Sequence, residues 1–235
     1  MDLALAIIFM CFGAISLVAF LLQKVKKYTL IETFTKTITS MFFIAVAGVG
    51  LFKNGQYVLA KLVIFGLFCG LLGDIALELK YVYPKDDKLY SYAGFILFAM
   101  GHVFFMLGLY LNYFKGNNPL YIIIPLVVGL LVSVVNILME KPMKLHYGEL
   151  KIISLVYGFF LFSFIGTAFS MFLLNGFKDI TIALILGGAV LFAISDLVLS
   201  GTYFGKGKDR PVDLVVNSVL YYIAQNLIAF SLFLI

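Results

Sequence analysis

Eight long stretches of almost uncharged residues constrain the fold of this chain more than any other feature. A helix needs about 20 apolar residues to cross the roughly 30 Å hydrocarbon core of a bilayer. The stretches that meet this length are residues 3–22, 33–52, 57–79, 90–113, 120–138, 150–174, 180–199 and 214–235. The gaps between them are short and carry turn signals such as Asn-Gly and Asn-Asn-Pro. We therefore expect an all-α bundle of eight transmembrane helices, with residues 1–235 forming a single integral membrane domain.

The composition excludes several classes of protein. Hydrophobic residues make up 63% of the chain and charged residues 12%, whereas soluble domains have about 45–50% and about 25%. This argues against a soluble enzyme and, despite a net charge of +5, against nucleic acid as a partner, because the lysines lie between apolar stretches. The apolar stretches also lack the alternation of barrel strands. Cys11 and Cys69 lie inside them and are expected to pack as small hydrophobic side chains.

The distribution of basic residues predicts the orientation in the membrane, because cytoplasmic loops carry an excess of Lys and Arg. If the N-terminus lies outside, 13 of the 17 basic residues fall on the inner side. These are Lys24, Lys26, Lys27, Lys36, Lys80, Lys85, Lys88, Lys141, Lys144, Lys151, Lys206, Lys208 and Arg210. We therefore expect both termini to be non-cytoplasmic, in the plasma (inner) membrane if the source is a bacterium.

Ionisable residues within the spans indicate a site, because each costs about 2.5–3.5 kcal/mol at the centre of a membrane helix. Asp74 and Asp196 lie about one turn from the inner ends of two spans of the same direction, and Lys36 lies at similar depth. We expect the two carboxyl groups to face one cavity within about 10 Å of each other. Glu78 and Lys36 are expected to reach towards the interface by snorkelling. A structural ion pair of Lys36 with either aspartate is the alternative.

Polar residues on other spans are expected to complete this site. His102 lies midway along the fourth span, and the last span carries a polar stripe at helical spacing. The stripe consists of Ser218, Tyr222, Gln225 and Asn226. The alternatives are a core histidine bonded to a backbone carbonyl and ordinary hydrogen bonds between helices.

A weak internal similarity suggests a duplication. A shift of 122 residues aligns Asp74 with Asp196 and also Gly66 with Gly188. It relates spans of the same direction, as a parallel repeat of four plus four helices would, and interfaces between repeats often hold membrane sites.

Four short motifs resemble those of the lysoplasmalogenase (YhhN) family. They are Gly-Leu-Leu-Gly-Asp-Ile-Ala-Leu (70–77), Ala-Met-Gly-His (99–102), Ala-Val-Leu-Phe-Ala-Ile-Ser-Asp-Leu-Val-Leu (189–199) and Tyr-Tyr-Ile-Ala-Gln-Asn-Leu-Ile (221–228). Their order and spacing match along the second to eighth spans. The resemblance implies a membrane enzyme that hydrolyses the vinyl-ether bond of lysoplasmalogens, releasing a fatty aldehyde and glycerophospho-ethanolamine or -choline.

The resemblance and the buried carboxyls together suggest roles. Vinyl-ether hydrolysis needs a general acid, a stabilising carboxylate and a base for water, and Asp74 and Asp196 are expected to divide these roles, in an order left open. Lys36 is expected to bind phosphate or to keep one carboxylate ionised. The partners are a lysophospholipid and the bilayer, with no cofactor and no metal expected. The residues expected to orient water or the glycerol hydroxyl are His102, Tyr222, Gln225 and Asn226.

Three alternatives remain open at this point. A proton-coupled transporter would also use eight helices and buried acids. A purely structural membrane protein is another. A metal site formed by Asp74, His102 and Asp196 is the third, although no Gly-x-Ser-x-Gly, His-Glu-x-x-His or phosphate-loop motif occurs in the sequence.

The orientation leads to a prediction about reporter fusions. We expect alkaline phosphatase fused after residue 235 to be active and a fluorescent reporter at the same position, which folds only in the cytoplasm, to stay dark. The reason is the excess of basic residues on the inner side. The opposite pattern would place the C-terminus in the cytoplasm and would contradict the predicted orientation.

Overall fold

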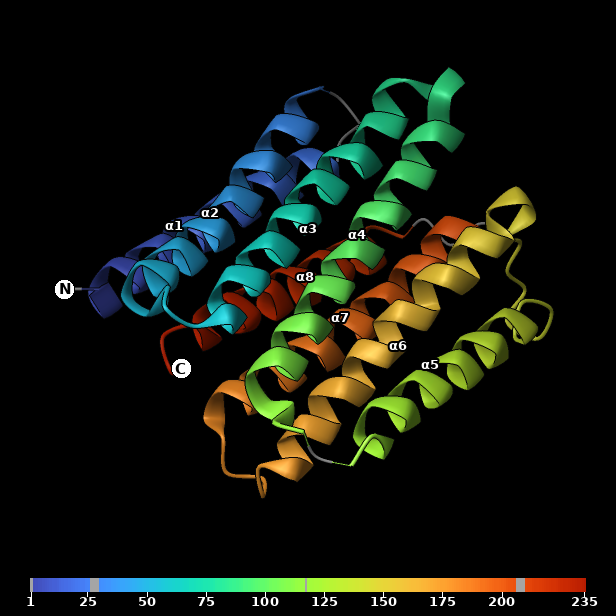
Figure 1. Ribbon diagram of the computed structural model, residues 1–235. Helices are drawn as coiled ribbons and strands as arrows, with labels where there is room; N and C mark the ends of the chain where they lie inside the picture. The colour runs from blue at the N-terminus through green and yellow to red at the C-terminus, as the bar shows by residue number, and fades with distance from the viewer. Residues whose placement is uncertain (1, 26–29, 117, 206–209) are drawn as a thin grey trace.

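The computed structural model describes residues 2–25, 30–116, 118–205 and 210–235, and in these segments all long elements are helices. Eight of them are long and apolar enough to cross a membrane, which confirms the expected all-α class. Figure 1 shows them as one bundle of roughly aligned helices. They are α1 (Asp2–Lys24), α2 (Leu30–Asn54), α3 (Val58–Val82), α4 (Asp87–Leu109), α5 (Leu120–Leu138), α6 (Lys151–Leu174), α7 (Ile180–Phe204) and α8 (Pro211–Ser231).

The helices extend beyond several of the predicted spans, because local capping and not hydropathy ends a helix. α7 continues past residue 199 to Phe204, where Gly205 has an extended backbone. α8 begins earlier than predicted, at Pro211, because proline suits the first position of a helix. The prediction that this span reaches residue 235 was wrong, since α8 ends at Ser231. α4 continues into a π-helical turn over Tyr110–Phe114.

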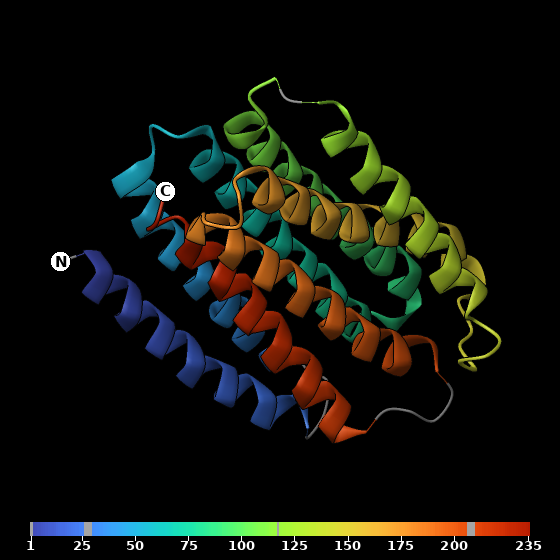
Figure 2. The same ribbon diagram turned by 90° about the horizontal axis from the view of Figure 1, so that it is seen from below.

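The contacts between helices repeat after four helices, in agreement with the expected parallel repeat. α1 packs on α2, α2 on α3 and α3 on α4, and the same sequence of contacts links α5 to α8. Between the halves, α4 contacts α6 and α8 contacts α2, which are again equivalent pairs. α1 and α5 lie at opposite edges of the bundle (Figures 1 and 2).

Two glycines show the same repeat at the level of side chains. Gly66 of α3 faces the carbonyl oxygen of Gly101 and the ring of Phe105. Gly188 of α7 faces the carbonyl oxygen of Ala224 and the side chain of Ile228. Gly66 therefore lets α3 approach α4 closely, and Gly188 lets α7 approach α8 in the same way, as small residues do in membrane bundles.

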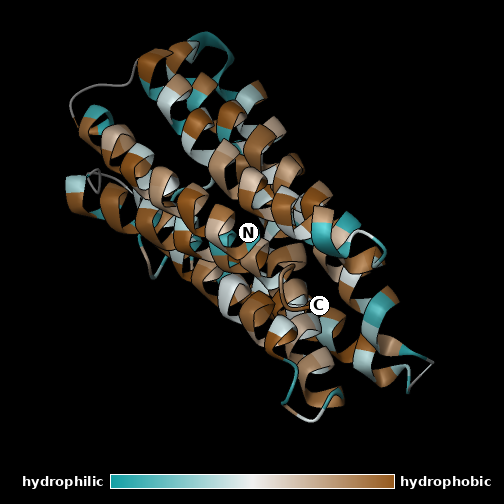
Figure 3. Cartoon of the chain, turned by 90° about the vertical axis from the view of Figure 1, so that its left-hand side faces the viewer, coloured by the Kyte–Doolittle hydropathy of each residue, from teal (hydrophilic) through white to brown (hydrophobic). Residues whose placement is uncertain are grey.

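The apolar surface suits contact with lipid. α1 buries only Ala6, Gly13 and Phe20, and α5 buries only Pro125, Gly129 and Ser133. Figure 3 shows hydrophobic residues over the length of the helices and hydrophilic ones mainly at their ends. The core lies between the remaining helices and contains fully buried rings such as Phe43, Phe164 and Phe192.

Some residues used for the predicted orientation fall outside the described segments. These are Lys26, Lys27, Lys206 and Lys208.

The close approach at Gly188 gives a test of the packing. A Cβ atom there would lie 2.9 Å from the carbonyl oxygen of Ala224 and 2.6 Å from Ile228 Cγ1. We expect Gly188→Ala to lower the stability by about 1–3 kcal/mol, because overpacking forces helices apart. Thermal denaturation in detergent measures this.

The matched control is Gly201→Ala in the same helix, where a Cβ would meet no atom within 4 Å. Alanine is also the better helix former, so this variant should melt no earlier than the parent protein. Equal melting temperatures for both variants would contradict the packing at Gly188.

Candidate functional site

One cavity contains most of the expected site residues, and it lies at the end of the bundle where α1 and α7 end. Asp74 from α3 and Asp196 from α7 both line it, as do Lys36 and Tyr222. The two aspartates therefore border the same cavity. Apolar side chains from α4 to α7 form another part of its wall, among them Phe95, Leu161 and Phe192. The cavity thus combines charged groups with an apolar surface.

Asp74 is buried and surrounded by donors. Its Oδ2 accepts hydrogen bonds from Ser40 Oγ at 2.6 Å and from the hydroxyl of Tyr221 at 2.7 Å. Lys36 Nζ lies 3.4 Å from Oδ1, and the hydroxyl of Tyr222 lies 3.0 Å from Ser40 Oγ. These partners stabilise the carboxylate form, since hydrogen bonds and a positive charge both favour the ionised state.

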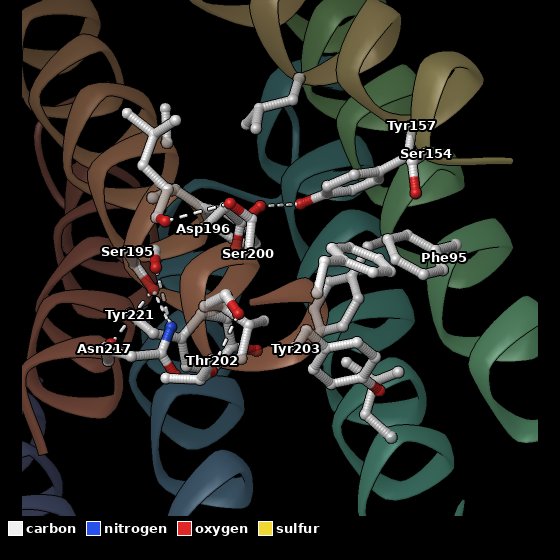
Figure 4. A pocket seen from close by; sticks show the side chains of 18 of the residues that line it. Phe95, Ser154, Tyr157, Ser195, Asp196, Ser200, Thr202, Tyr203, Asn217 and Tyr221 are labelled. Carbon is white, nitrogen blue, oxygen red and sulfur yellow. Dashed lines mark hydrogen bonds between the residues drawn. The ribbon is translucent and has the colours of Figure 1, made fainter. Parts of the chain in front are cut away.

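Asp196 has different surroundings. It points across the cavity towards Tyr157 of α6, whose hydroxyl donates a hydrogen bond to Oδ2 (Figure 4). Within the described segments, no Lys or Arg forms an ion pair with it. Beside it, Ser195 bonds with Asn217 of α8 instead of turning to the carboxyl group. The two carboxyls therefore differ in charge compensation, although they occupy equivalent positions in the repeat.

Glu78 and Lys36 do not reach outwards as expected. The side chain of Glu78 is 3% exposed and that of Lys36 is 14% exposed. Glu78 Oε1 accepts from Lys36 Nζ at 3.0 Å and from Lys24 Nζ at 2.6 Å. Compensation by two ammonium groups explains why this carboxylate tolerates burial. The alternative of an ion pair with Lys36 holds for Asp74 and not for Asp196.

Three of the expected orienting residues lie away from the cavity wall. His102 is buried among the rings of Tyr157, Phe164 and Phe192, and neither of its ring nitrogens bonds to a described residue. Two of these rings, Tyr157 and Phe192, line the cavity, so His102 packs behind its wall. Gln225 donates to the hydroxyl of Tyr221 at 3.0 Å and so acts behind it.

Asn226 has a structural contact instead. Its side-chain nitrogen donates to the backbone oxygen of Tyr222 at 2.8 Å, one turn earlier in α8. This is the local bond that polar side chains often make in helices. Of the stripe predicted on α8, only Tyr222 and Ser218 line the cavity.

The sequence reasoning missed the two tyrosines that bond directly to the carboxyls. Tyr221 is in the Tyr-Tyr pair of the α8 motif, but helical spacing favoured its neighbour Tyr222. Tyr157 carries no motif. Only the internal repeat could have pointed to Tyr157, because a shift of 121 residues aligns it with Lys36, the partner of Asp74.

The possible metal site finds no support in the geometry. Among the segments that the structure describes, no three His, Cys, Asp or Glu side chains form a group that could hold a metal ion. His102 is surrounded by aromatic rings, and neither of its nitrogens bonds to a described residue. The arrangement instead provides two carboxyl groups with unlike neighbours, which suits acid–base chemistry.

Comparison with known proteins gives one family and no individual relative. Neither the curated proteins nor the solved structures contain a match to the chain. The model of the YhhN family matches residues 31–232, which include both aspartates, all four motifs and seven of the eight helices. This chain therefore belongs to the YhhN family of membrane proteins.

Proposed function

We propose that this protein is a membrane hydrolase that cleaves the vinyl-ether bond of lysoplasmalogens, alkenyl-glycerophosphoethanolamine or -choline. The family resemblance implies the reaction. The observation that carries the proposal is the pair Asp74 and Asp196, which line one cavity with unlike charge neighbours. An apolar wall beside these groups suits the single hydrocarbon chain of such a substrate.

We assign the acid to Asp196 because no cation compensates a negative charge on it in the described segments. Asp196 gives its proton to the alkenyl carbon that is not bonded to oxygen, and an oxocarbenium ion forms. Asp74, held as a carboxylate by Lys36, Ser40 and Tyr221, stabilises this cation. These roles follow the rule that unlike surroundings separate the acid from the base.

Water then completes the reaction. Asp74 accepts a proton from a water molecule while the oxygen of that water bonds to the oxocarbenium carbon. The product of this step is a hemiacetal. In the collapse of the hemiacetal, Asp196 takes the hydroxyl proton while Asp74 returns its proton to the glycerol oxygen. The products are a fatty aldehyde and the glycerophospho-base, and both carboxyl groups regain their starting states.

The orientation in the membrane belongs to this proposal. With both termini outside, the end of the bundle that carries Lys24, Lys36 and Glu78 faces the cytoplasm. The headgroup of the substrate would then enter from the inner leaflet.

Exchange of either carboxyl for an amide tests the mechanism. We expect Asp74→Asn and Asp196→Asn each to lower kcat by about 10²–10⁴-fold, because an amide neither transfers the proton nor carries the charge. The double variant should be little worse, since the groups act together. Aldehyde release from lysoplasmenyl-ethanolamine by detergent-purified protein measures this.

The control is Asp86→Asn, an identical change at an exposed carboxyl that precedes α4. It should keep the parent activity, and all variants should melt alike. Near-full activity of Asp196→Asn or Asp74→Asn would remove that residue from the mechanism. Proton-coupled transport without aldehyde release by the parent protein would favour the transporter instead.

Removal of one hydroxyl tests the positioning of Asp196. We expect Tyr157→Phe to lower kcat roughly tenfold, because the Tyr157 hydroxyl stabilises the negative charge that develops on Asp196 as its proton leaves, and a hydrogen bond to a charged group contributes about 1.5–3 kcal/mol. KM should change little, since Tyr157 is assigned to the acid and not to the headgroup. Steady-state kinetics of aldehyde release give both constants.

Tyr110→Phe is the matched control, because it also removes a hydroxyl that bonds at 2.8 Å, to Thr167, away from the cavity. It should leave kcat unchanged. If both variants lost the same activity, Tyr157 would have no specific role beside Asp196.

A further inference from the structure

The charged end of the cavity contains lysine and carboxylate side chains in contact with each other. Lys24 of α1 and Lys36 of α2 line it together with Asp74 and Glu78 of α3. Lys80, two residues further along α3, is not among the lining residues, and its ammonium lies 3.0 Å from the ring centre of Tyr203 and 4.5 Å from that of Tyr81. Two ammonium groups, those of Lys24 and Lys36, therefore line this end of the cavity beside two carboxylates.

These two ammonium groups are held close together by a single oxygen. Glu78 Oε1 lies 2.6 Å from Lys24 Nζ and 3.0 Å from Lys36 Nζ. The side chains of the two lysines are 9% and 14% exposed, and both border the cavity. An anion that enters the cavity thus meets two cations whose positions are already fixed, which lowers the entropic cost of binding it.

The packing of α1 against the bundle places Lys24 beside Glu78. The buried residues of α1, Ala6, Gly13 and Phe20, repeat every seven positions, so one narrow stripe faces the bundle. Phe20 is fully buried, and its ring centre lies 5.0 Å from Lys24 Nζ and 5.9 Å from Lys36 Nζ. A ring at this distance stabilises cations. Lys24 lies outside the residues matched to the family, 31–232, so the family match does not account for it.

The spacing of Glu78 and Asp74 along α3 sets the distance between the two lysines and the carboxyl group that takes part in the reaction. Glu78 follows Asp74 by four residues, which is about 6 Å along a helix axis. A three-carbon glycerol unit spans a comparable length, with the vinyl ether at one end and a phosphodiester at the other. A phosphodiester carries one negative charge, and its oxygens can accept hydrogen bonds from both ammonium groups.

We propose that Lys24 and Lys36, held by Glu78, form the subsite that binds the phosphodiester of the lysophospholipid headgroup. This proposal rests on the proposed function and deepens it. Glu78 is a positioning residue here, because it touches the two lysines and not the reacting atoms. The subsite makes the first helix part of substrate selection.

A pair of substrates tests the subsite in the full-length protein. Lysoplasmenyl-ethanolamine carries the phosphodiester, and 1-alkenyl-glycerol has the same vinyl ether without it. We expect Lys24→Met to lower the ratio of kcat/KM for the first over the second by roughly ten- to a hundredfold, the effect of losing a bond between charged groups. Lys24→Arg keeps the charge and should restore most of the ratio.

Lys88→Met is the matched control, because Lys88 is paired with Glu149 on the exposed surface. It should leave the ratio unchanged. An unchanged ratio in Lys24→Met would overturn the proposal. So would an equal loss with both substrates, because it would show a general effect of α1 on the fold.

A binding measurement keeps the test independent of turnover. Glycerophosphoethanolamine should raise the melting temperature of the parent protein and raise that of Lys24→Met much less, because a ligand stabilises the state that binds it. Failure of this shift overturns the subsite even if lysoplasmalogen is hydrolysed. A shift without hydrolysis supports the subsite and contradicts the proposed reaction. A shift with inorganic phosphate alone would overturn the lipid headgroup as its ligand.

Discussion

Burial of charge in an apolar bundle is the constraint on which the site depends. Lys36 lies between two carboxylates, 3.4 Å from Asp74 and 3.0 Å from Glu78. Removal of one partner of such a buried group would leave an uncompensated charge, at a cost of about 3–5 kcal/mol. The helices α1, α2, α3 and α8 must therefore meet at this point, because each supplies a member or a hydrogen-bond donor of the network.

The repeat explains how one fold provides two unlike carboxyl groups. Asp74 and Asp196 occupy equivalent places on α3 and α7, and each meets side chains from the preceding helix. These are Lys36 and Ser40 for Asp74, and Tyr157 for Asp196. The preceding helix thus gives Asp74 a cation besides a neutral donor, and gives Asp196 a neutral donor alone. This asymmetry is the basis for the assignment of base and acid.

Much of the fold could be predicted from the sequence, because length and hydropathy determine which segments cross a bilayer. The placement of Asp74, Asp196 and Lys36 at the same end of the bundle could also be predicted, since direction and depth follow from the order of the spans. The rotation of each helix about its axis could not. It decides that Tyr221 and not Gln225 reaches Asp74, and that His102 turns into a group of rings. The burial of Glu78 could not be predicted either, because it depends on the ion pair with Lys24, and the sequence places Lys24 in a loop.

The most direct test of the central claim is hydrolysis of lysoplasmalogen in D₂O, followed by mass spectrometry of the trapped aldehyde. Protonation of the alkenyl carbon by an exchangeable carboxyl group predicts one deuterium on the carbon next to the aldehyde carbon. The same product should form far more slowly with Asp196→Asn. Release of aldehyde without deuterium at that carbon would contradict carboxyl-catalysed protonation as the first step.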